Sequence, residues 1–177
     1  MIPIKIDGEK YNIKSILELN TAEYIEVTNI PDLDIVKYIA WSTGQSWADA
    51  FFCKYDKLVE KAIGGFTDVT KIKVDKKYKK YEISTVGQRY QIETCKKNGS
   101  ELLVFVVAVA MAKSNEIEKV YEVQKELMEK PYIEVIPAGV FFLKRLKNGS
   151  YYDKTFFQKI RVFLTTLLTG KPLELSD

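Results

Sequence analysis

Histidine is absent from the 177 residues of this chain, and its absence removes several classes of function. A Ser-His-Asp or Cys-His catalytic arrangement is excluded within the chain, because the imidazole is the general base in both. Histidine is also the commonest metal ligand and the usual proton acceptor near neutral pH. We therefore expect a protein that is not an enzyme and that holds no cofactor and no metal.

Cysteine is scarce as well, since Cys53 and Cys95 are the only two and lie far apart without a C-x-x-C spacing. Two thiols without a histidine are too few ligands for a zinc site. We expect buried or free thiols rather than a disulfide, which fits a reducing cytoplasm.

Long apolar runs and targeting segments are also missing. The longest apolar run, Leu102–Ala112, has eleven residues, whereas a helix needs about twenty to cross a bilayer. Met1–Lys5 leads directly into a strand pattern, without the charged and apolar regions of a signal peptide. We therefore expect an intracellular protein without a membrane partner.

Charge is abundant, and it is divided into blocks. The net charge of +3 conceals two basic stretches. Lys71–Lys97 has nine Lys or Arg against three Asp or Glu, and Lys144–Lys171 has seven against one. The remainder of the chain is acidic, at −9 (3 − 6 − 6). Such segregation indicates surfaces that meet an oppositely charged partner, either a neighbouring copy or a polyanion.

A short sequence pattern occurs twice. Ile4–Tyr11 returns as Ile72–Tyr78, each with an alternating apolar and polar run, a turn-forming aspartate and a second run that reaches a tyrosine. The pattern predicts two β-hairpins of similar design, over residues 2–14 and 71–83. In the first hairpin, Asp-Gly stands between alternating runs, which is the strongest short-range signal for a hairpin.

Helical patterns dominate the second half of the chain. Leu102–Ala112 is apolar on every face, so that a buried helix and a buried strand both fit; its continuation to Lys113 favours the helix. Ile117–Met128 has the spacing of an amphipathic helix that Pro131 ends, and Pro137 is expected to begin another.

The predicted fold class is α+β, with two hairpin elements in the first half and helices in the second. We expect a single domain over residues 1–177. The alternative is a division into 1–70 and 71–177, each with a hairpin followed by helices.

The basic second hairpin is the first candidate interaction surface. Its lysines alternate with tyrosines, and such side chains can neutralise phosphates and stack on bases. Lysines on one face of a half-buried strand also protect a sheet edge, and we favour this or a protein-facing role over nucleic acid. The candidate residues are Lys71, Lys73, Lys76, Lys77, Tyr78, Lys79, Lys80, Tyr81 and Arg89.

A second candidate is the apolar stripe of a helix predicted over Asp153–Thr169. It could dock against another subunit, although such a stripe more often belongs to the core of its own domain. The candidate residues are Phe156, Phe157, Ile160, Phe163, Leu164 and Leu167.

Ile6–Tyr11, Leu19–Glu26 and Thr85–Glu93 together resemble small structural and assembly proteins of tailed bacteriophages, in particular phages of Bacteroidota. In such proteins a G-x-x-Y hairpin precedes a T-x-G/A-E/Q-Y-I segment, and a helical second half ends in paired phenylalanines. Phe141–Phe142 and Phe156–Phe157 match the paired phenylalanines.

The resemblance implies a non-enzymatic structural protein of the virion, in many copies in a ring at the head–tail connector, the portal–tail region. Its partners are then copies of itself and other phage structural proteins, in the virion or in the host cytoplasm during assembly. Lys71–Lys97 would meet an acidic neighbour such as Glu116–Glu134, or packaged DNA. The alternatives are a tail-assembly chaperone and a nucleic-acid-binding module that uses the Lys/Tyr hairpin.

Overall fold

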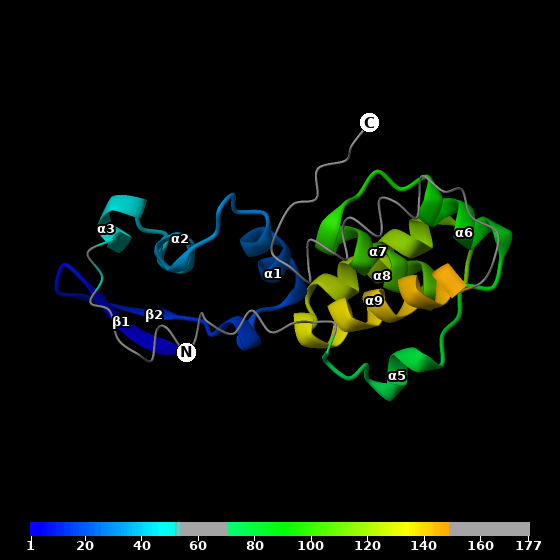
Figure 1. Ribbon diagram of the computed structural model, residues 1–177, viewed down its shortest axis with the longest axis horizontal. Helices are drawn as coiled ribbons and strands as arrows, with labels where there is room; N and C mark the ends of the chain where they lie inside the picture. Colours follow the sequence, from blue (N-terminus) through cyan, green and yellow to red (C-terminus); the bar gives the residue numbers. More distant parts are fainter. Residues whose placement is uncertain (52, 54–70, 149–177) are drawn as a thin grey trace. The chain divides into compact units, whose positions relative to one another are not determined.

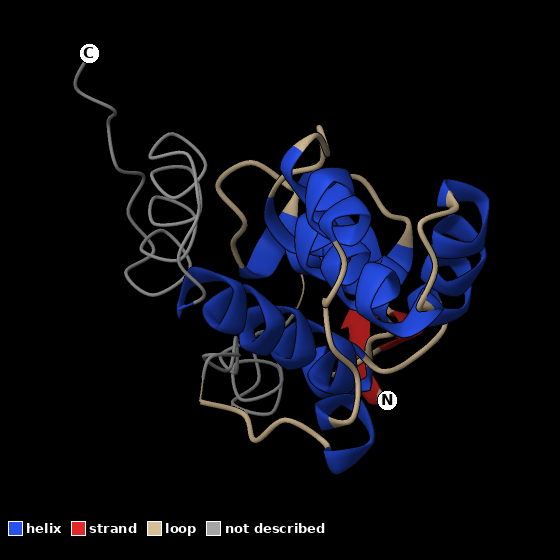
Figure 2. Cartoon of the chain, turned by 90° about the vertical axis from the view of Figure 1, so that its right-hand side faces the viewer, coloured by secondary structure: helices blue, strands red, loops and turns tan. Residues whose placement is uncertain are grey.

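The structure of the protein is a computed structural model that describes residues 1–51, 53 and 71–148. Helices predominate, and one two-stranded antiparallel sheet is the only sheet in these residues (Figure 1; red in Figure 2). This composition is compatible with the predicted α+β class.

The chain forms two compact units, and each is described by itself. Unit 1 contains the described residues of Met1–Thr67 together with Met128–Ile133. Unit 2 contains the described residues of Asp68–Leu127 and Glu134–Asp177. Unit 1 is therefore built from two stretches that are distant in the sequence.

The sheet of unit 1 is the first predicted hairpin, which is confirmed. Strands β1 (Ile2–Ile6) and β2 (Glu9–Ile13) pair in antiparallel register. Between them, Asp7 and Gly8 both have positive φ, at 48° and 87°. This is the backbone of a type I′ turn, whose twist matches that of the flanking strands. The buried side chains of the hairpin are those of Ile4, Ile6 and Ile13.

Four helical elements follow the hairpin among the described residues of unit 1. They are η1 (Ile16–Glu18), α1 (Thr21–Thr28), α2 (Ile35–Thr43) and α3 (Trp47–Phe51). Helix α2 ends at Gly44, whose φ of 69° is a conformation that glycine adopts without steric cost.

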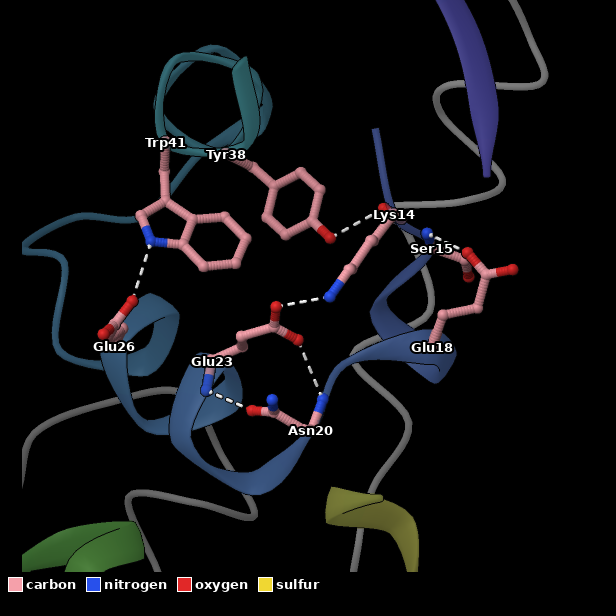
Figure 3. A network of polar contacts seen from close by, with 8 residues as sticks. All are labelled: Lys14, Ser15, Glu18, Asn20, Glu23, Glu26, Tyr38 and Trp41. Carbon is pink, nitrogen blue, oxygen red and sulfur yellow. Dashed lines mark hydrogen bonds and ion pairs between the residues drawn. The ribbon is translucent and has the colours of Figure 1, made fainter. Parts of the chain in front are cut away.

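Reciprocal capping boxes begin η1 and α1 (Figure 3). At α1, the backbone N–H of Glu23 donates to Asn20 Oδ1 at 2.8 Å, and the N–H of Asn20 donates to Glu23 Oε2 at 3.0 Å. Ser15 and Glu18 form the corresponding pair at η1. Each box satisfies two backbone donors that a helix start otherwise leaves without partners.

Glu23 also links α1 to the end of the hairpin, because its second oxygen pairs with the ammonium group of Lys14 (Figure 3). The Tyr38 hydroxyl, from α2, donates to the Lys14 carbonyl at 2.8 Å. Tyr38 itself is fully buried. A small polar network therefore joins the hairpin and two helices within unit 1.

This network predicts a specific dependence on pH. Burial raises the pKa of Glu23, but the hydrogen bonds from Lys14 and Asn20 outweigh it and hold the pKa below its usual 4.5. A carboxyl with a lowered folded-state pKa stabilises the fold fully above its unfolded pKa, and this stabilisation is lost as the pH falls through the folded value. Glu23→Gln keeps an oxygen for the capping box and removes the charge. We expect a loss of at most about 1 kcal/mol at neutral pH.

The measurement is urea unfolding of the wild type and Glu23→Gln at several pH values. The difference between them should shrink as the pH falls below 4.5, the usual pKa of the carboxyl. A difference that stays constant down to strongly acidic pH would contradict the assigned pairing.

The segment 128–133 is held against the start of α1. The backbone N–H and the hydroxyl of Thr21 both donate to the Lys130 carbonyl at 2.8 Å. The rings of Tyr24 and Tyr132 are stacked, with centroids 4.1 Å apart and planes within 3°. Both tyrosines are buried. The stack therefore helps to fix this segment against α1 in unit 1.

Unit 2 consists of helices in its described part. They are α5 (Lys76–Lys79), α6 (Val86–Glu93), α7 (Gly99–Ala112), α8 (Ile117–Met128) and α9 (Tyr132–Asn148), of which α8 and α9 each have one end in unit 1. Helix α7 contacts α8 through the rings of Phe105 and Tyr121, whose centroids are 6.3 Å apart, and it approaches α9 closely at Gly139 (Figure 1).

Helix α7 is the centre of unit 2. Its residues Leu103–Ala110 are all buried, as expected for a segment that is apolar on every face, and the helix expected there is confirmed. The buried side-chain amide of Gln88 donates to the Val109 carbonyl at 3.0 Å, which attaches α6 to α7. No helix in the described part of the chain is both long enough and apolar enough to span a membrane.

Two sequence predictions for unit 2 are wrong. The second hairpin is not formed: residues 71–75 are in loop and turn, and α5 follows at Lys76. The side chain of Asp75 accepts a hydrogen bond from the Lys77 N–H at 2.9 Å, so the aspartate caps a helix instead of turning a hairpin. Pro137 does not begin a helix but lies inside α9, which starts at Tyr132. The burial of Val135 favours the earlier start.

Candidate interaction surface

The basic residues around α5 form the candidate surface. Lys73, Lys76, Lys79 and Lys80 are exposed. Within the described residues, no ion pair is formed by any of these four side chains. Lys71 is exposed as well. We call Lys73, Lys76, Lys79 and Lys80 the lysine surface.

Lys77 and Tyr78 do not belong to this surface. Lys77 forms ion pairs with Glu134 of α9 and, at 3.7 Å, with Asp75. Its hydrogen bond with Glu134 raises the pKa of the ammonium group. Tyr78 is only 2% exposed, so its ring cannot stack on a base. These two side chains attach α5 to the body of unit 2.

Tyr81 is half-buried and has two cations near its ring. The ammonium groups of Lys80 and Lys113 lie 5.2 and 5.5 Å from the ring centroid. Such cation–π contacts stabilise each charge by about 0.5–1 kcal/mol at exposed sites. The ring is thus engaged within unit 2.

Arg89 lies on α6 and lines a pocket of about 200 Å³. The pocket is also lined by Arg145 of α9, a residue outside the candidate surfaces that the sequence predicts. The two arginines are fifty-six positions apart in the sequence, and no local pattern connects them. Arg89 is therefore part of a different feature from the lysine surface.

Unit 2 also carries an acidic helix face. Glu118, Glu122 and Glu126 follow one another at four-residue spacing on α8, which places them on one side of the helix. All three are exposed, and within the described residues none is in an ion pair. Like charges at this spacing destabilise a helix by about 0.2–0.5 kcal/mol per pair. We call these three residues the glutamate face.

The predicted docking helix, with Phe156, Phe157, Ile160, Phe163, Leu164 and Leu167, lies outside the described residues. Among those that are described, no group of three or more cysteine, aspartate or glutamate side chains could hold a metal ion.

Comparison of the chain with protein-family models, with curated proteins and with solved structures found no match.

Proposed function

We propose that this protein is a non-catalytic structural subunit that associates in many copies through complementary charge. The observation that carries the proposal is that the described part of unit 2 holds two charged surfaces of opposite sign that form no ion pairs. The lysine surface has four exposed cations, and the glutamate face has three exposed carboxylates. The lysine surface of one copy then binds the glutamate face of the next.

The two surfaces differ, so the contact is heterologous rather than isologous. A heterologous contact repeated by rotation closes into a ring, or otherwise extends into a filament. The sequence resemblance to phage proteins implies a ring at the head–tail connection of a tailed phage. A heterologous contact that closes by rotation would form such a ring. The ion pair between Lys77 and Glu134 supports the same pairing of basic and acidic surfaces, here within one copy.

A nucleic-acid-binding role is less favoured by the geometry. Tyr78 is buried, and Tyr81 is engaged by two lysines. Base stacking, which supplies sequence-tolerant affinity for single strands, therefore has few rings available around α5.

Charge reversal tests the proposed contact. We expect Lys76→Glu/Lys79→Glu to weaken self-association at least about tenfold at low salt, because two attractive contacts become repulsive. Glu118→Lys/Glu122→Lys should have the same effect from the other side. An equimolar mixture of the two variants should associate again, since each then offers the other an oppositely charged surface. The measurement is the mass of each sample by light scattering.

The matched control is Lys5→Glu/Lys10→Glu, which reverses two exposed lysines that face each other across the hairpin of unit 1. It should leave association unchanged. If the mixture of the two unit 2 variants stays dissociated, or if the control weakens association equally, the proposed pairing of surfaces is wrong.

A further inference from the structure

The pocket beside α6 and α9 is lined by two guanidinium groups, and no carboxylate of the described residues is bound to them. Arg89 and Arg145 both line it, together with the exposed Glu82. Within the described residues, no carboxylate oxygen lies within 4.0 Å of a nitrogen of either arginine. Two positive charges therefore face one small volume and have no ion-pair partner among the described residues.

Arg89 shows this most directly. Its Nε–H is buried and has no hydrogen-bond partner in the described part of the chain. Leaving a buried donor unsatisfied is unfavourable, and more so when the group is charged. A bound oxyanion would remove this penalty, because a guanidinium donates to both oxygens of a planar anion.

Arg145 is held in place by an aromatic ring. Its guanidinium carbon lies 5.3 Å from the centroid of the Phe141 ring. This contact restricts the side chain to fewer rotamers before an anion binds. Binding therefore costs less side-chain entropy. Arg145 is exposed, so its replacement should not disturb the core.

The remaining lining residues give the ligand its apolar part. Ile83, Phe142 and Leu146 are the other described residues of the lining. Its volume of about 200 Å³ exceeds that of an isolated carboxylate or phosphate and leaves room for a few methylene groups. The geometry points to a site for a carboxylate on a short aliphatic stem. This site is separate from the lysine surface and does not depend on self-association.

The test is an NMR titration of the protein with acetate, propionate and butyrate at constant ionic strength. Affinity should rise by up to about fourfold for each methylene added, because each is buried against the apolar wall. Shifts should be confined to residues around the pocket. Inorganic phosphate at the same ionic strength should bind more weakly than butyrate.

Variants identify the groups responsible. Arg145→Gln should reduce butyrate affinity about tenfold or more, as expected for loss of a charged hydrogen-bond donor. Glu82→Gln should increase it, because a repelling charge is removed. Lys144→Gln is the matched control: it deletes one exposed positive charge at the neighbouring position, outside the pocket lining, and should leave affinity unchanged.

Arg89 is partly buried, so Arg89→Gln could prevent folding. Arg89→Lys is therefore the variant to use: it retains the charge, loses the planar fork of donors and should weaken butyrate binding. Equal loss in Lys144→Gln and Arg145→Gln would overturn the proposal, because it would show general charge attraction. Affinity that does not change with stem length, or tighter binding of phosphate, would overturn it as well. None of these outcomes would affect the proposed self-association, which the charge-reversal variants test separately.

Discussion

Replacing Tyr132 with alanine should cost about 3–5 kcal/mol of unfolding free energy, the range found for large aromatic residues removed from a core. Tyr132 has no exposed surface, and its ring is stacked on Tyr24. The substitution removes this stack and leaves a cavity where 128–133 is held against α1. Urea unfolding gives the free energy. Amide exchange should show the loss of protection in α1, to which the segment is bound.

Tyr132→Phe is the control, because it removes only the hydroxyl and keeps the ring. The hydroxyl is buried and has no hydrogen-bond partner among the described residues, and burial raises the pKa of the phenol to about 12. Because an unsatisfied buried hydroxyl is unfavourable, Tyr132→Phe should be as stable as the wild type or more stable. If Tyr132→Phe is damaged as severely as Tyr132→Ala, the ring stack is not the stabilising contact.

Gly139→Ala should destabilise unit 2 by about 1–3 kcal/mol, the usual cost of overpacking. A methyl group at Gly139 would lie 2.6 Å from the Leu103 carbonyl oxygen, 2.7 Å from the Leu103 Cβ and 2.9 Å from the Leu103 carbonyl carbon. Two of these three closest atoms belong to the backbone of α7, so relief requires the two helices to move apart. Helix propensity alone predicts the opposite sign, because alanine is favoured over glycine by about 1 kcal/mol inside a helix.

Gly87→Ala is the matched control in α6. Its nearest neighbours are the side-chain atoms of Asn115, at 2.7 Å, and a flexible side chain can move. We expect a change within about 0.5 kcal/mol of the wild type, as for a surface substitution. Thermal or urea unfolding measures both variants. A stabilised Gly139→Ala would contradict the close approach of α7 and α9.

The two similar sequence patterns show where local signals suffice to predict the fold. In the first, Asp7 and Gly8 both adopt positive φ, and the glycine makes the tight turn inexpensive. In the second, a lysine follows Asp75, and a lysine disfavours positive φ. The aspartate therefore caps a helix there. The alternation in the two patterns was similar, and the missing glycine was the informative difference.

Of the candidate interaction surface, the sequence could predict only which side chains are exposed. The lysine surface is exposed, as a run of lysines usually is. Sequence alone did not show that Lys77 is paired with Glu134, fifty-seven positions away. It also did not show that Arg89 and Arg145 line one pocket. Both depend on how α9 packs, which no short-range pattern specifies.

Self-association through complementary charge is the central claim, and the mass of the wild-type protein by light scattering tests it most directly. The measurement compares about 20 mM salt with about 0.5 M salt, which shortens the Debye length severalfold. The proposal predicts a discrete oligomer at low salt that dissociates as the salt rises. A monomer at both salt concentrations would contradict self-assembly through these surfaces and would favour a tail-assembly chaperone, whose partner is another protein.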